Sequence, residues 1–200
     1  MNIKVIVFDA DGVVINSPGY FSLQYQKDFG VSNDVMLPFF KGVFQDCLVG
    51  KADLREELKK VLDDWKWKGT IDELLDYWFK SEHHIDDRVL REIKNLQSKG
   101  IKCYIGTKQE KYRTEYMKKE MGFEEIFDGI YSSAYVGYKK PDERFYEEIS
   151  KDLKNKEGIR VEEIMFFDDE KENVDAANKF GWQAYLYKNF NNFQEKINQI

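Results

Sequence analysis

Three short segments of continuous apolar character each end abruptly on polar or acidic residues. The segments, with the residues that follow them, are 5–8 with Asp9, 101–106 with Thr107, and 164–167 with Asp168-Asp169. Short apolar runs of this kind are typical of strands that are buried on both faces of a parallel sheet. Because ligands bind at the carboxyl ends of such strands, we expect the three polar ends to meet at one site.

Helical patterns follow these strands. Residues 88–97 and 173–180 carry apolar side chains at helical spacing, and Gly100 and Gly181 are placed to end the two helices. Alternating strands and helices imply right-handed crossovers between parallel strands. The pattern therefore predicts an α/β fold, a Rossmann-like open parallel sheet flanked by helices.

The interval 17–86 breaks this alternation, because it offers helical segments and no convincing buried strand. Asp53 with Glu56, and Thr70 with Glu73, have the spacing of capping boxes and predict helices over 54–65 and 71–80. We therefore predict an all-helical insert at 17–86 and a core made of 1–16 and 87–200, with a short helix over 190–200. Aromatic residues of the insert are expected to pack mainly with one another, with one or two lining a pocket: Phe39, Phe40, Phe44, Trp65, Trp67 and Trp78.

Composition narrows the class of protein. The 200 residues are 42% hydrophobic, which fits one globular unit with a sizeable core. A net charge of −6, from 37 acidic and 31 basic residues, provides no basic field for nucleic acid or an anionic membrane. Cys47 and Cys103 form no CxxC pair that would suggest a zinc or redox centre. The first apolar run is interrupted by the carboxylate of Asp9 too early for a signal peptide, and no apolar run reaches transmembrane length. We expect a cytoplasmic protein with free thiols.

The segment Asp9-Ala10-Asp11-Gly12 is the first candidate for chemistry. Two acids at the exit of a buried strand are poorly explained by stability, since a desolvated acid is costly unless it is paired or bound to metal. Residues two apart in a strand point the same way, so Asp9 and Asp11 can face one pocket, and Gly12 lets the chain turn sharply beside a ligand. The alternative is a strand-end turn with an aspartate that caps the next helix.

The order of the other motifs favours the first interpretation. Asp9-x-Asp11-Gly12 is followed by Thr107, then by Lys140-Pro141, then by Asp168-Asp169 with Asn173. This set resembles the haloacid dehalogenase-like hydrolase superfamily, whose four motifs it matches in order over essentially the whole chain. The insert lies where members with a helical type C1 cap carry theirs. The last motif is most similar to the branch that contains the phosphatase domain of soluble epoxide hydrolase and bacterial sugar-phosphate phosphatases.

The resemblance implies a role for each motif residue. Asp9 would be the nucleophile that forms an aspartyl-phosphate, and Asp11 would be the general acid and base. Thr107 and Lys140 would bind the phosphoryl group. Mg²⁺ would be held by Asp9, Asp169 and the backbone carbonyl of Asp11, and Asp168 would orient Lys140. Without the motif order, Thr107 could simply end a strand and Lys140 could be a solvated lysine.

The expected activity is Mg²⁺-dependent hydrolysis of a small phosphate monoester, with sugar phosphates as the favoured class. A phosphomutase of the same superfamily and a non-hydrolytic protein regulated by a phospho-aspartate are the alternatives. Asp11 argues against carbon–halogen cleavage, which needs no acid at that position. Lys108 departs from the family pattern, since relatives commonly have Asn after the Ser or Thr. His83, His84 and Lys51 are expected to be ordinary helix-end or solvated residues.

Overall fold

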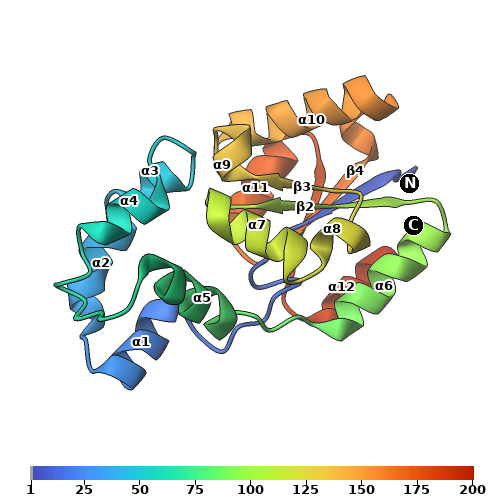
Figure 1. Cartoon of the computed structure of the whole chain (residues 1–200). Helices are drawn as coiled ribbons and strands as arrows, with labels where there is room; N and C mark the ends of the chain where they lie inside the picture. Colours follow the sequence, from blue (N-terminus) through green and yellow to red (C-terminus); the bar gives the residue numbers. More distant parts are fainter. Residues whose placement is uncertain (1) are drawn as a thin grey trace.

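A computed structural model describes residues 2–200 and contains one parallel sheet in the order β3-β2-β1-β4-β5 (Figure 1). The strands are β1 (Val5–Phe8), β2 (Lys102–Thr107), β3 (Gly129–Ser132), β4 (Ile164–Asp168) and β5 (Gln183–Leu186). Phe8 of β1 lies in register with Ile105 of β2 and with Phe167 of β4. The prediction of an open parallel α/β sheet is confirmed, and the three polar strand ends lie side by side.

Two of the five strands, β3 and β5, lie outside the sequence prediction. Both are edge strands, and most of their residues are only half-buried. An edge strand needs no continuous apolar run, since one of its sides is not covered by another strand. The apolar pattern that marked the three central strands is therefore weak in these two.

Helices cover both faces of the sheet. One face packs against α6 (Asp87–Ser98), α7 (Lys111–Lys119), α8 (Phe123–Ile126) and α12 (Phe190–Ile197). The other packs against α10 (Glu143–Glu157) and α11 (Lys171–Phe180), with the short α9 (Ser133–Val136) and a 3₁₀ turn, η1 (Val161–Glu163), nearby. Alternate residues of β1 belong to the two cores: Ile6 and Phe8 to one, Val5 and Val7 to the other.

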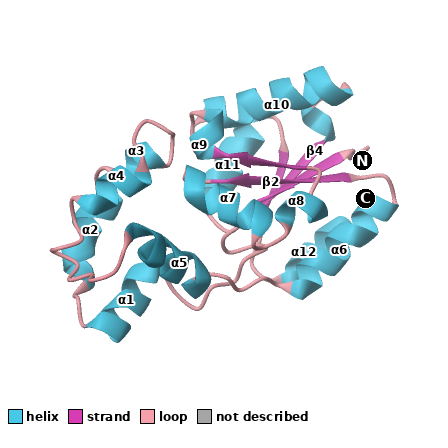
Figure 2. Cartoon of the chain, viewed as in Figure 1, coloured by secondary structure: helices cyan, strands magenta, loops and turns pink. Residues whose placement is uncertain are grey.

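The insert contains α1 (Phe21–Phe29), α2 (Asn33–Lys41), α3 (Phe44–Cys47), α4 (Leu54–Lys59) and α5 (Ile71–Ser81). Figure 2 shows these helices as a separate group beside the sheet, and residues 17–81, all of which the structure describes, form no strand. They share a third apolar cluster, which includes every aromatic residue named above for the insert. The lobe boundaries 1–16 with 87–200 and 17–86 stay a prediction.

The two expected capping boxes differ. The Thr70 hydroxyl accepts the Glu73 N–H at 3.2 Å, and the Glu73 carboxylate accepts the Thr70 N–H at 2.7 Å, which is a complete box. Asp53 caps α4, but the carboxylate of Glu56 pairs with Lys59 instead of returning to the cap. The prediction of a helix over 54–65 is wrong: α4 ends at Lys59, and turns carry the chain to Lys66, which has a left-handed φ of 56°. Those turns allow Trp65 to be fully buried.

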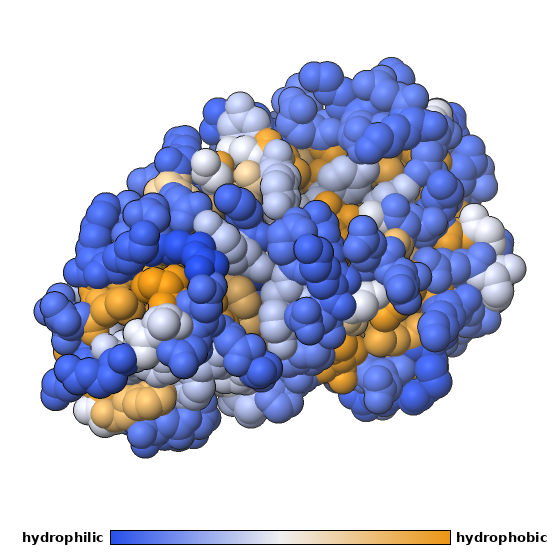
Figure 3. Space-filling model, viewed as in Figure 1, coloured by the Kyte–Doolittle hydropathy of each residue, from blue (hydrophilic) through white to orange (hydrophobic). Residues whose placement is uncertain are grey.

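The visible surface is mainly hydrophilic, with apolar atoms gathered in patches that include the insert at the left of Figure 3. Exposed apolar side chains of the insert include Tyr20, Leu23, Phe29 and Val35. Across residues 2–200, no helix combines the length and the hydropathy that crossing a membrane requires.

Candidate active site

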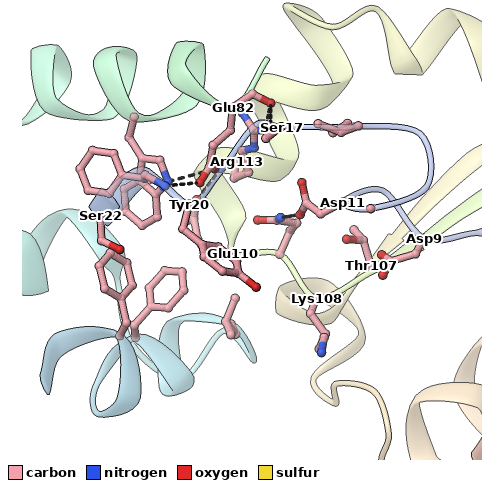
Figure 4. A pocket seen from close by; sticks show the side chains of 18 of the residues that line it. Asp9, Asp11, Ser17, Tyr20, Ser22, Glu82, Thr107, Lys108, Glu110 and Arg113 are labelled. Carbon is pink, nitrogen blue, oxygen red and sulfur yellow. Dashed lines mark hydrogen bonds between the residues drawn. The ribbon is translucent and has the colours of Figure 1, made fainter. Parts of the chain in front are cut away.

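The predicted site residues converge on one pocket of about 1020 Å³ between the strand ends and the insert. Asp9 and Asp11 follow β1, Thr107 ends β2, Asp169 follows β4, and Lys140 lies in the loop before α10. Figure 4 shows Asp9, Thr107 and Asp11 at one end of this pocket and the side chains of the insert at the other. The sheet register explains the convergence, because the strands that carry these residues are immediate neighbours.

A buried lysine links the first and last motifs. The Lys140 ammonium nitrogen lies 2.8 Å from Oδ2 of Asp9 and 2.6 Å from Oδ2 of Asp168. The other oxygen of Asp168 accepts hydrogen bonds from the Glu170 N–H at 2.8 Å and from the Asn173 side chain at 3.0 Å. Both oxygens of Asp168 are thus occupied by donors of the protein, an arrangement that suits a residue that positions Lys140.

The site carries more negative than positive charge. Burial raises the pKa of Asp9 to about 8, and the charges of Asp168 and Asp11 add to this rise, while Lys140 opposes it. Burial alone would lower the pKa of Lys140, but the two carboxylates beside it raise that pKa above its ordinary value. When Asp9, Asp168 and Asp169 are all ionised, the single ammonium group of Lys140 leaves this site short of positive charge.

The geometry fits a divalent cation. Carboxylate oxygens of Asp9, Asp168 and Asp169 lie within 4.8 Å of one another. Asp168 accepts three hydrogen bonds from nitrogen donors, whereas Asp9 accepts one at each oxygen, from the Ala10 N–H at 2.7 Å and from Lys140 at 2.8 Å. Asp9 and Asp169 therefore keep more oxygen lone pairs for a cation than Asp168 does. Mg²⁺ commonly takes one or two protein carboxylates, with water and phosphate completing its shell. The donor set therefore suits Mg²⁺.

Gly12 makes this arrangement possible. Its φ is +77°, and a Cβ at this position would lie 2.2 Å from Oδ2 of Asp169. Only glycine combines that backbone conformation with so close an approach. The sequence-level reason for Gly12, a sharp turn beside a ligand, thus takes a specific form: the turn makes room for the Asp169 carboxylate.

Two further side chains reach the site from the end of β2, and one of them, Gln109, lies outside the sequence prediction. Gln109 donates a hydrogen bond from its amide to Oδ2 of Asp11, and Lys108, the departure from the family pattern, pairs with Glu170. The position of Gln109, two residues beyond Thr107 at the same strand end, is the signal that could have pointed to it. Lys108 is thereby held at the rim of the acidic cluster.

The remaining residues singled out from the sequence lie apart from this cluster. His83 shares a 2.9 Å hydrogen bond with the Tyr116 hydroxyl, while His84 and Lys51 are exposed. In residues 2–200, the acidic triad above is the one group of candidate metal ligands that comes together. Of the aromatic residues, Phe40, Phe44 and Trp78 belong to the insert core and also line the pocket.

A family model described as haloacid dehalogenase-like hydrolase matches residues 3–181. The chain belongs to this hydrolase family, as the motif order predicted.

Two curated relatives match parts of this chain. A sesquiterpene phosphatase from Aspergillus oryzae is 34% identical over 97 residues, which are 48% of this chain and 47% of that protein. A drimenol cyclase from Aspergillus calidoustus is 32% identical over 75 residues, 38% of this chain and 13% of that protein. The match thus spans less than half the length of these curated relatives.

Among solved structures, a HAD-like hydrolase from Porphyromonas gingivalis aligns over 100% of this chain and 98% of its own, with 23% identity and a TM-score of 0.81. A HAD family enzyme from Bacteroides thetaiotaomicron, in complex with magnesium and inorganic phosphate, aligns over 93% of this chain and 94% of its own. The two chains are 20% identical, and the TM-score is 0.79. These similarities establish the fold.

Proposed function

We propose that this hydrolase is a Mg²⁺-dependent phosphatase that acts on small phosphate monoesters through an aspartyl-phosphate on Asp9. The observation that carries the proposal is the position of Asp9, which follows a central strand, contacts the buried Lys140 and faces the same pocket as Asp11. The phosphatase among the relatives and the phosphate complex among the structural neighbours support it. A cytoplasmic location and the absence of nucleic-acid partners stay predictions.

The first half of the reaction transfers the phosphoryl group to the protein. An Asp9 carboxylate oxygen attacks phosphorus, and the bond from phosphorus to the ester oxygen breaks. Asp11 gives its proton to the departing alkoxide, which leaves as an alcohol. The Gln109 amide holds Asp11 in the pocket during this step.

The second half restores the enzyme. Asp11, now a carboxylate, takes a proton from a water molecule while the water oxygen attacks phosphorus. The bond between phosphorus and Asp9 breaks, which releases inorganic phosphate and regenerates both side chains. Thr107 can donate its hydroxyl to a phosphoryl oxygen, and Lys140 adds positive charge where negative charge accumulates. Asp168 keeps the Lys140 ammonium in place.

Mg²⁺ would be held by Asp9, Asp169 and the backbone carbonyl of Asp11. When bound, it would supply the positive charge that the acidic cluster lacks and neutralise charge on the phosphoryl oxygens.

The test is phosphate release from a panel of monoesters with and without Mg²⁺, for the wild type, Asp9→Asn and Asp11→Asn. We expect Asp9→Asn to lose at least about 10³-fold in turnover, as nucleophile variants do. Acid-quenched wild type should carry an acyl-phosphate that hydroxylamine releases, and Asp9→Asn should not. Wild-type turnover by Asp9→Asn would refute the proposed nucleophile.

Product analysis separates the two alternatives from hydrolysis. Isomerised sugar phosphate without free phosphate would identify a mutase. A phospho-Asp9 that persists without turnover would identify a regulatory protein.

A further inference from the structure

The pocket that begins at the acidic cluster continues into an apolar chamber between the helices of the insert. Its wall there includes Leu37, Phe40, Phe44, Leu48, Trp78 and Phe79. These residues come from α2, α3, α5 and the turn after α3, and aromatic rings of the insert point into the pocket in Figure 4. A ligand that places its phosphate at Asp9 would therefore extend its leaving group along apolar side chains.

The charged groups beside this chamber are already bonded within the protein. The two oxygens of Glu82 accept the Phe21 N–H at 3.0 Å and the Trp78 indole N–H at 3.1 Å. Arg113 donates to the carbonyls of Phe79 and Glu82, at 2.9 and 3.2 Å. Figure 4 shows Glu82 and Arg113 close together above the pocket. They join the insert to the core: each Glu82 oxygen accepts one hydrogen bond, and Arg113, which is 2% exposed, donates two.

Glu110 and Gln45 follow the same pattern, whereas the hydroxyls of Tyr20 and Ser22, which also line the pocket, form no hydrogen bond within residues 2–200. The oxygens of Glu110 accept the N–H groups of Tyr112 and Arg113, and the Gln45 amide bonds to Lys139 and to the Phe40 carbonyl. Among the pocket residues that the structure describes, the buried side-chain atoms without a partner are Asn33 Oδ1 and Arg113 Nε. Two such atoms could serve one polar group of a ligand.

A sugar phosphate is a poor match for such a wall. Each sugar hydroxyl that leaves water without a new hydrogen bond costs about 1–3 kcal/mol. An apolar leaving group gains free energy on the same surface with each methylene that it buries.

We propose that the substrates of this site are phosphate monoesters of apolar alcohols, with an extended aliphatic or isoprenoid-like chain, rather than sugar phosphates. The inference rests on the proposed phosphatase function and names its substrate class. The apolar chain lies in the chamber formed by α2, α3 and α5, and the phosphate lies at the strand ends.

The test is a series of linear alkyl phosphates from ethyl to decyl, assayed below micelle-forming concentrations beside glucose 6-phosphate and acetyl phosphate. We expect kcat/KM to rise about threefold to fourfold per methylene until the chamber is filled. Calorimetric binding of alkyl phosphonates of the same lengths should give the same order without turnover.

Two substitutions in α2 form a matched pair. Leu37 lines the chamber, whereas Val35, two residues away and 45% exposed, does not. Leu37→Asp should lower the ratio of decyl to ethyl kcat/KM at least tenfold, and Val35→Asp should leave this ratio unchanged. Leu23→Asp, at an exposed position of the pocket wall, should lower the ratio even if Leu37→Asp fails to fold.

The outcomes distinguish this inference from the proposed function. A flat alkyl series together with efficient hydrolysis of glucose 6-phosphate or acetyl phosphate would overturn the substrate class and leave the phosphatase intact. Absence of hydrolysis for every ester would overturn both. An unchanged decyl-to-ethyl ratio in folded Leu37→Asp and Leu23→Asp would also reject the chamber as the binding surface.

Discussion

The two ends of the pocket are built on opposite physical principles. At the strand ends, Asp9, Lys140 and Asp168 are buried charges held in place by one another. In the insert, residues 17–86, Ser22 and Asp86 are the two buried polar or charged side chains apart from aromatic ones, and aromatic rings pack against one another. Burial of charged groups costs free energy, but such groups can take part in a reaction. Burial of apolar groups is favourable, and an apolar wall binds a ligand by excluding water. In the function proposed above, the reaction depends on the core and the substrate preference depends on the insert.

The largest expected effect is the loss of the buried cation. Lys140→Met leaves Asp9 and Asp168 buried without their partner, which should lower the free energy of unfolding by about 3–5 kcal/mol. Lys139→Met is the matched control, because Gln45 is the one hydrogen-bond partner of the Lys139 amine within residues 2–200, and its removal should cost about 1 kcal/mol. Urea unfolding of both variants without added metal measures this difference. Equal losses would show that the charge cluster is not specially dependent on Lys140.

The free energy of unfolding should depend on pH through Glu110, which lines the pocket between the core and the insert. Burial raises the pKa of Glu110 from its ordinary value of 4.5 to about 7, even though the N–H groups of Tyr112 and Arg113 act against this rise. The folded protein therefore holds this proton more tightly than the unfolded chain does. The contribution is fully present below about pH 4.5 and is lost as the pH rises to about 7, which lowers the free energy of unfolding by up to about 3 kcal/mol.

Glu110→Gln cannot ionise, so its stability relative to the wild type should increase over that pH window. Urea unfolding at several pH values measures the difference. Parallel stability curves for the two proteins would mean that the pKa of Glu110 is the same in the folded protein and in the unfolded chain.

The same glycine conformation has different consequences in the two regions. Gly12 and Gly30 both have a left-handed φ, but a Cβ would meet Asp169 at the first position and nothing within 4 Å at the second. Gly12→Ala should displace the Asp169 carboxylate and weaken Mg²⁺ binding about 10- to 100-fold by calorimetry. Gly30→Ala should cost about 1 kcal/mol of stability and leave Mg²⁺ affinity unchanged. Unaltered Mg²⁺ affinity in Gly12→Ala would remove Asp169 from the metal site.

The smallest expected effect concerns the helix caps of the insert. Thr70→Ala removes the capping box of α5 and should lower stability by about 1 kcal/mol while turnover is kept. Asp53→Ala also removes a cap, but Asp53 additionally accepts the Tyr112 hydroxyl of the core at 2.7 Å, so it should cost more. Thermal unfolding compares the two. Equal costs would indicate that the contact with Tyr112 contributes nothing to the attachment of the insert.

Much of the fold could be read from local patterns. The central strands β1, β2 and β4 were predictable because burial on both faces demands continuous apolar residues, and Thr70 with Glu73 marked a helix start correctly. The edge strands β3 and β5 and the early end of α4 were not, because half-buried strands and left-handed turns leave weaker signals. The role of Gln109 was not predicted, because its contact with Asp11 joins residues that lie far apart in the chain.

The sequence by itself determined the family, the order of the strand ends and the candidate chemistry of Asp9-x-Asp11-Gly12, because these depend on residues that are close together in the chain or in motif order. Only the tertiary structure decided that Lys140 lies between Asp9 and Asp168, and that Asp169 fills the space beside Gly12. It alone showed the apolar chamber, whose wall joins side chains about 40 residues apart, from Leu37 to Phe79. Helical periodicity shows that a side chain is apolar, but only packing determines whether that side chain faces a core or a ligand.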